Sequence, residues 1–313
     1  MMKRRSFLRS GMLGAAALGL LPLHRVPALI ARGGSEAEGT ATLSIVDGPD
    51  IALTVRAAVN ALGGMGHFVK HGDVVLLKPN MSFANPPEWG STTHPDVIRE
   101  VVRLCVEAGA KRVVAVDFPM RRAAACLERS GMTALAASMP ELTFVELGEE
   151  QQFESVPTPK AIEFKEVAVA KLARKADVLI NLPTAKAHGG TTVSFGMKNL
   201  MGLIHDRRVF HGDYNLSSAV ADLAGVIRPQ LTIMDAVHCM LDNGPQGPGT
   251  VKTLNTILAG SDPVAVDAAT LGLTQWNGRT LTPADVRHIA LAAERGVGTL
   301  QVPMEQIVRT SLG

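Results

Sequence analysis

Short runs of β-branched and aliphatic residues alternate with helical patterns along most of this chain of 313 residues. Residues 74–77 are apolar throughout, which is typical of a strand buried on both faces of a sheet. Strands that alternate with helices favour an α/β fold, with a mostly parallel sheet covered by helices on both faces. The predicted strands are residues 43–46, 74–77, 112–116, 142–146, 161–164, 177–180 and 231–234, with 257–259 as an edge strand.

The helices predicted between these strands begin and end at Gly, Pro and capping residues. Pro95 begins one helix, with Thr93 or His94 as its N-cap, and Asp262 is the expected N-cap of another. The pattern loosens near residues 140–165, so a looser second subdomain stays open there. The predicted helices span residues 51–62, 95–108, 263–273 and 283–295.

The N-terminus combines a basic cluster with a short apolar run. Arg4-Arg5 precede a polar residue, Phe and Leu, which matches the twin-arginine export pattern, and residues 11–23 are too short for a comfortable permanent membrane span. Such a segment is typical of a targeting signal and is excluded from the fold. The sequence predicts a signal over residues 1–31, with cleavage within 28–37, and an α/β domain over residues 40–313. A helix belonging to the fold and an uncleaved membrane anchor are the alternatives.

The predicted signal implies the twin-arginine translocase as a partner and a periplasmic or other extracytoplasmic location. The formal net charge is +2, and five basic residues lie within the signal, so the rest of the chain is slightly acidic. Without a long basic run, nucleic-acid binding lacks its electrostatic requirement. The three cysteines are widely spaced and form no zinc or iron–sulfur motif. No permanent membrane span is expected.

Polar side chains follow several of the predicted strands. In open α/β sheets, ligands bind outside the carboxyl ends of the strands, where side chains from neighbouring strands converge. The alternative is that each residue only caps a loop or the next helix. These strand-end residues are Lys78 with Asn80, Asp117, Asn181 and Asp235.

The segment 181–211 is the densest in chemically useful side chains. Lysines and glycine-rich backbone suit an anion such as phosphate or carboxylate, and histidines suit proton transfer or a metal. The catalytic candidates are Lys186, His188 and His211, and the candidate metal ligands are His205, His211 and Asp235. The candidate substrate-binding residues are Lys78, Asn80, Asn181, Lys198, Asn199, Asp235 and Asp267.

Asp267 lies within an apolar helical pattern, so its carboxylate needs either solvent or a buried partner. Lys198 or Lys186 is the partner that we expect for it, because an ammonium group would offset the cost of burying the carboxylate.

Many short motifs of this chain, in order, resemble the DUF362 family. They include Lys78-Pro79-Asn80, Thr92-Thr93-His94-Pro95, Ala108-Gly109-Ala110, Asp117, Asn181-Leu182-Pro183 with Lys186 and His188, Met197-Lys198-Asn199-Leu200-Met201-Gly202, His211, Asp235-Ala236, Gly244-Pro245 with Gly247, and Ser261-Asp262-Pro263-Val264-Ala265-Val266-Asp267. Many members of that family carry ferredoxin-type cysteine clusters beside this domain. This chain has none, so no iron–sulfur cluster is expected in it.

The residues favour an enzyme that acts on a small anionic substrate, a carboxylate or a phosphate, at a site of Lys, His and Asp side chains. The alternative is an accessory protein that carries a metal or cofactor outside the cytoplasm. A purely structural protein would not explain charged residues at strand ends. The resemblance to DUF362 names the family without naming the reaction.

Overall fold

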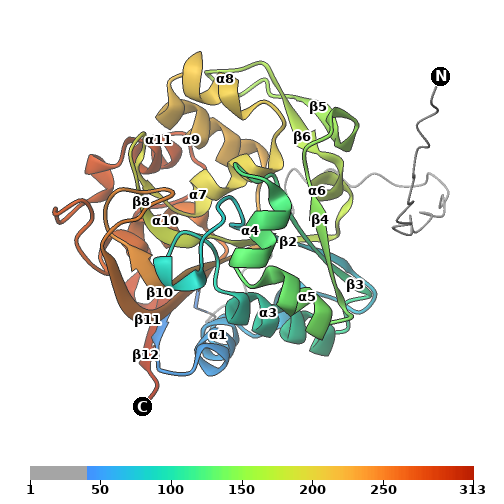
Figure 1. Ribbon diagram of the computed structural model, residues 1–313. Helices are drawn as coiled ribbons and strands as arrows, with labels where there is room; N and C mark the ends of the chain where they lie inside the picture. Colours follow the sequence, from blue (N-terminus) through green and yellow to red (C-terminus); the bar gives the residue numbers. More distant parts are fainter. Residues whose placement is uncertain (1–40) are drawn as a thin grey trace, which may run out of the picture.

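Ten strands form the central sheet within residues 41–313, the part of the chain that this computed structural model describes (Figure 1). Along the sheet the order is β12 (Ile307–Ser311), β1 (Leu43–Asp47), β11 (Val251–Gly260), β10 (Leu231–Met240), β7 (Val178–Leu182), β2 (Val74–Pro79), β3 (Arg112–Asp117) and β4 (Leu142–Glu146). Two further strands, β8 (Thr184–His188) and β9 (Thr192–Ser194), extend from β10.

The sheet is mostly parallel, with β11 antiparallel to both of its neighbours. The adjacent strands β10, β7, β2, β3 and β4 all run parallel. Their carboxyl ends therefore lie along one edge of the sheet, which is where ligands bind in α/β folds.

Helices cover both faces of the sheet, and each face has its own hydrophobic core. Side chains alternate across the sheet, so Val75 and Leu77 enter one core while Leu76 enters the other. Helices α1 (Ile51–Asn60), α3 (Pro95–Glu107) and α5 (Met132–Ser138) contribute to the first core, and α9 (Leu216–Val226), α10 (Pro263–Leu271) and α11 (Arg287–Glu294) to the second. The predicted α/β fold with helices on both faces is confirmed.

The remaining helices are short. They are α2 (Met65–Phe68), α4 (Ala123–Arg129), α6 (Lys171–Lys175), α7 (Gly196–Asn199) and α8 (Arg207–Gly212), with single 3-10 turns at Pro87–Trp89, Glu150–Gln152, Leu200–Leu203, Pro283–Asp285 and Met304–Gln306. Two predicted caps are confirmed. The His94 side chain accepts a hydrogen bond from Asp96 N at the start of α3, and Asp262 caps α10.

The strand predicted at residues 161–164 is wrong. These residues form a turn in which the N–H groups of Ile162 and Glu163 donate to Asp222 Oδ2 at 2.7 and 2.9 Å. The strands lie on either side of the turn, as the antiparallel pair β5 (Phe153–Pro157) and β6 (Glu166–Ala170). Apolar side chains of this pair pack into the same core as α9, so the looser segment shares the main body of the protein.

Two other boundaries differ from the prediction. Residues 257–259 form no edge strand, because they are the end of β11, which lies between β1 and β10. The helix predicted at 283–295 begins only at Arg287. A capping box between Thr282 and Asp285 completes a separate 3-10 turn, and Val286 then adopts an extended conformation.

The signal predicted for residues 1–31, with its cleavage at 28–37, lies outside the described residues. None of the helices in residues 41–313 combines the length and the apolarity needed to cross a lipid bilayer.

Candidate functional site

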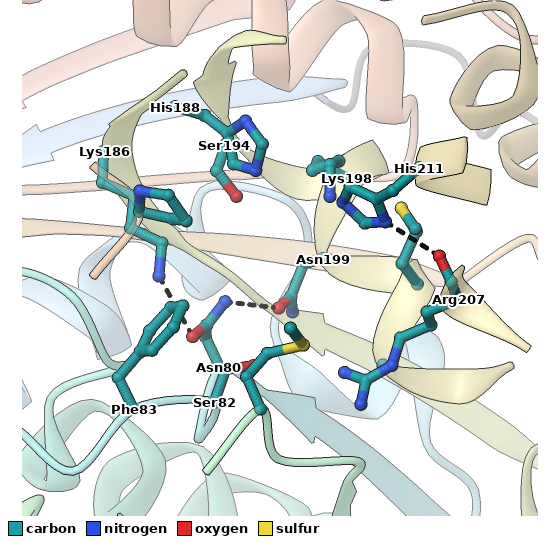
Figure 2. A pocket seen from close by; sticks show the side chains of 14 residues that line it. Asn80, Ser82, Phe83, Lys186, His188, Ser194, Lys198, Asn199, Arg207 and His211 are labelled. Carbon is teal, nitrogen blue, oxygen red and sulfur yellow. Dashed lines mark hydrogen bonds between the residues drawn. The ribbon is translucent and has the colours of Figure 1, made fainter. Parts of the chain in front are cut away.

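A cavity of ≈ 100 Å³ opens beside the carboxyl end of β2, where Asn80 contributes to its wall (Figure 2). The other walls come from β8, β9, α7, α8, the Leu200–Leu203 turn, the loops after β2 and β3, and the loop around Pro245. One water needs about 10–15 Å³ of such space, so the cavity suits a molecule of a few non-hydrogen atoms.

The cavity wall is strongly cationic. Lys186, Lys198 and Arg207 line it together with two histidines, and no Asp or Glu does so among residues 41–313. A positive wall without a compensating carboxylate is suited to an anion, and the polar wall atoms offer hydrogen bonds to it.

Lys198 has no hydrogen-bond or ion-pair partner among residues 41–313. Its side chain reaches the cavity from α7 and is only 8% exposed. Burial, reinforced by the nearby Arg207 charge, lowers the pKa of Lys198 to about 7. A buried amine that no protein group satisfies is poised to meet a ligand.

Lys186 is also buried, but its ammonium group has protein partners. Its Nζ donates to the carbonyl oxygen of Ser91 and, at 3.2 Å, to Asn80 Oδ1. The same nitrogen lies 5.0 Å from the centre of the Phe83 ring, within the range of a cation–π contact. Burial lowers the pKa of Lys186 to about 7, opposed by Asp117 and reinforced by the charge of Lys198.

Three asparagine side chains, two of which line the cavity, form a chain of hydrogen bonds. Asn199 Nδ2 donates to Asn181 Oδ1 at 2.9 Å, and Asn199 Oδ1 accepts from Asn80 Nδ2 at 3.0 Å. Asn181 in turn donates to the carbonyl oxygen of Gly196 at the start of α7. The amides thus connect three segments and orient the Asn80 oxygen that Lys186 contacts (Figure 2).

Lys78, another predicted substrate-binding residue, contacts three acceptors within the protein. Its Nζ lies 2.9 Å from Asp117 Oδ1 and also donates to Pro79 O and Asn199 Oδ1. An ammonium group has three protons, so these three acceptors use its donor capacity. Lys78 does not line the cavity.

The two histidines of the cavity are in different hydrogen-bonding states. His188 Nδ1 accepts from Gly190 N at 2.9 Å and from Thr191 N at 3.2 Å, so the neutral ring carries its proton on Nε2. Burial and the charge of Lys198 lower the pKa of His188 to about 3, which keeps the ring neutral.

His211 Nδ1 lies 2.8 Å from the carbonyl oxygen of Arg207. A carbonyl only accepts, so Nδ1 donates and Nε2 retains a lone pair. Burial lowers the pKa of His211 below its usual value. The cavity therefore pairs a ring that donates, His188, with a ring that accepts a proton, His211.

Besides Lys78 and Asn181, three more predicted residues do not line the cavity. Asp267 does not pair with a lysine, because its carboxylate accepts from Gly196 N at 2.7 Å and Met197 N at 3.0 Å and so fixes the start of α7. Asp235 accepts from His94 N and Val237 N. His205 packs its ring against Phe118 and Phe153.

The metal candidates do not form a metal-binding cluster in the described part of the chain. Within residues 41–313 there is no group of three or more His, Cys, Asp or Glu side chains placed to hold a metal ion. Of the three candidates only His211 lines the cavity.

The candidates from the sequence did not include Arg207 and Ser194, two polar residues of the wall. Arg207 lies over the Phe118 ring at 4.0 Å and donates to Phe118 O and Pro119 O, with further N–H groups left for a ligand. Ser194 in β9 pairs in register with Lys186 in β8, which brings both side chains to the cavity. Arg207 lies between two predicted histidines, and Ser194 lies within the dense segment, so proximity in sequence was the available signal.

Comparison with known proteins identifies the family. A family model described as "Domain of unknown function (DUF362)" matches residues 75–272. A thylakoid-associated protein of Synechocystis sp. is 31% identical over 254 residues, which cover 79% of this chain and 75% of that relative. The lactate racemase apoprotein of Thermoanaerobacterium thermosaccharolyticum matches in structure with a TM-score of 0.45 and 13% identity, over 73% of this chain and 56% of that one. The chain belongs to the DUF362 family.

Proposed function

We propose that the cavity binds a small carboxylate or phosphate and that the protein is an enzyme that transfers a proton on the bound anion. The observation that carries this proposal is Lys198, a buried ammonium group with no partner in residues 41–313, in a cavity wall that holds two more cations and no acid. A bound anion would supply the missing partner.

The side chains divide into binding and proton-transfer roles. Lys186, Lys198 and Arg207 bind the anionic group, and Asn80 orients Lys186. His188 donates a hydrogen bond from its Nε2–H to an oxygen of the ligand, and His211 accepts a proton at Nε2. A neutral donor next to an acceptor is what acid–base chemistry on a small anion needs.

Calorimetric titration with propionate and with inorganic phosphate tests the proposal. We expect Lys198→Met to weaken binding of the better probe at least about tenfold, because a hydrogen bond to a charged group contributes about 1.5–3 kcal/mol. Lys160→Met is the matched control, since Lys160 is exposed and distant in sequence from the cavity wall. If the wild-type protein binds neither probe, or if the two variants bind equally well, the proposed function is wrong.

We propose further that residues 1–31 are a twin-arginine signal, that the translocase exports the chain, and that the α/β domain of residues 40–313 works outside the cytoplasm. Arg4-Arg5 and the following apolar run support this, and the similarity to a thylakoid-associated relative is compatible with it. Replacing Arg4 and Arg5 by Lys should leave the protein in the cytoplasmic fraction. Unchanged export of that variant would contradict the proposal.

A further inference from the structure

We propose that Lys198 is a nucleophile that forms an imine with the carbonyl group of a small 2-oxo acid. This inference rests on the proposed function, because it assigns a substrate class and a covalent step to the same cavity. It starts from the different environments of the two cavity lysines, which Figure 2 shows entering from separate elements.

Lys186 is unsuited to covalent chemistry. Two of its three protons are held by Ser91 O and Asn80 Oδ1, and the Phe83 ring lies beside the ammonium group. These contacts hold the Lys186 nitrogen in place and occupy two of its donor positions. Lys186 is therefore a binding group for the carboxylate of the substrate.

Lys198 lacks such contacts within residues 41–313. Burial and a neighbouring guanidinium make the charged form of Lys198 costly, and its pKa of about 7 leaves a substantial fraction as the neutral amine near neutral pH. A lysine that is desolvated next to another cation is the kind of amine that attacks carbonyl carbon.

The neighbours of Lys198 supply the proton movements that an imine requires. The charge of Lys198 lowers the pKa of His188 and of His211, so its amine is within electrostatic reach of both rings. The Ser194 hydroxyl also faces the cavity and has no hydrogen-bond partner in the described part of the chain. His211 Nε2 is the acceptor in this group, and His188 Nε2–H and Ser194 are the donors.

The covalent step balances without an added oxidant or reductant. The Lys198 nitrogen bonds to the carbonyl carbon, and the carbonyl oxygen becomes a hydroxyl. His211 Nε2 carries the two nitrogen protons to that oxygen in turn: the first forms the hydroxyl, and the second converts it to water, which leaves while the carbon–nitrogen double bond forms. No group changes its oxidation state, and hydrolysis reverses the step.

The cavity limits the substrate to a short 2-oxo acid. In the proposed complex its carboxylate accepts hydrogen bonds from Lys186 and Arg207. The carbonyl carbon, which is bonded directly to that carboxylate, then faces Lys198. The volume of ≈ 100 Å³ admits only a few non-hydrogen atoms beyond these groups.

Reductive trapping tests the inference. The purified protein is incubated with pyruvate and sodium cyanoborohydride and then analysed by intact mass and peptide mapping. We expect one reduced pyruvate adduct on Lys198, suppressed by excess propionate and dependent on the hydride. Lys160→Arg replaces an exposed lysine and is the control. It should form the Lys198 adduct to the same extent as the wild type.

Lys198→Arg separates the imine from anion binding, because arginine retains the positive charge but forms no imine under these conditions. It should still bind propionate and lose the adduct. The imine is wrong, while the proposed function stands, if the wild type binds propionate but forms no pyruvate adduct. The same conclusion follows if the adduct forms only on exposed lysines and excess propionate does not suppress it. If the wild type neither binds propionate nor traps pyruvate, both fail.

Discussion

Lys78 Nζ lies 2.9 Å from Asp117 Oδ1, and both side chains are buried next to Gly202, which lines the cavity. Asp117 also accepts from Met81 N at 2.7 Å and Phe118 N at 2.8 Å, so the pair fixes the loops that follow β2 and β3. Removing one partner of a buried ion pair leaves the other charge uncompensated.

We therefore expect Lys78→Met to lower the free energy of unfolding by about 3–5 kcal/mol. Denaturant unfolding followed by circular dichroism measures this change. Lys160→Met should change it by no more than about 0.5 kcal/mol, as is usual for surface substitutions. If Lys78→Met were as stable as the wild type, the ion pair would not have the structural role described above.

Because Gly202 has no side chain, there is room beside it for the buried Lys78–Asp117 pair. A Cβ atom at this position would collide with Asp117 Oδ1 and with Lys78 Cε. We expect Gly202→Ala to destabilise the protein by about 3 kcal/mol in a thermal unfolding experiment, because overpacking must move a buried ion pair. Gly66→Ala is the control, since a Cβ there meets nothing within 4 Å. Equal melting temperatures for the two variants would contradict this reading.

Asp267 positions the short helix that carries Lys198. Its two carboxylate oxygens accept from the N–H groups of Gly196 and Met197. Asp267→Ala leaves both buried donors unpaired, which should cost about 2–5 kcal/mol of stability and also weaken propionate binding by moving α7. Urea unfolding and calorimetry measure the two effects. Asp213→Ala, at an exposed position, should change neither, and unaltered binding by folded Asp267→Ala would argue against a positioning role.

Anion affinity should fall as the pH rises. Lys186 and Lys198 each have a pKa of about 7, lowered mainly by burial, so both are charged below that pH and neutral well above it. A bound anion favours the charged form of each lysine, so binding raises both pKa values. At a pH near or above about 7, where the free protein has partly neutral lysines, binding therefore takes up protons. Propionate stays ionised in this range. Calorimetry in buffers of different ionisation enthalpy measures the uptake, and an affinity that stays constant or rises with pH would contradict it.

The sequence predicted the buried parallel strands well and the half-exposed ones poorly. β2 and β7 are apolar because helices cover both of their faces. The first half of β11 mixes exposed polar residues such as Lys252 and Thr253 with Val251 and Leu254, so it gives no continuous apolar run and its place inside the sheet was missed. Residues 161–164 were misread because Ala161 and Phe164 are buried in the core while the backbone between them binds Asp222.

The sequence placed the polar candidates at the edge of the sheet where the cavity opens, but it did not predict their hydrogen-bond partners. The rule that ligands bind at the carboxyl ends of parallel strands placed Asn80, Asn181 and Lys186 near one another, and their hydrogen bonds confirm that proximity. Which lysine is neutralised and which has no partner depends on contacts across more than 30 positions, such as Lys78 with Asp117. The residues next to each lysine in the sequence do not indicate such contacts.

A crystal structure with propionate tests most directly whether the cavity is an anion site. We predict the carboxylate inside the cavity, with an oxygen within hydrogen-bond distance of Lys198 Nζ and the other facing Lys186 or Arg207. A structure at saturating propionate in which the cavity holds only water, or in which Lys198 Nζ pairs with a protein carboxylate, would contradict it.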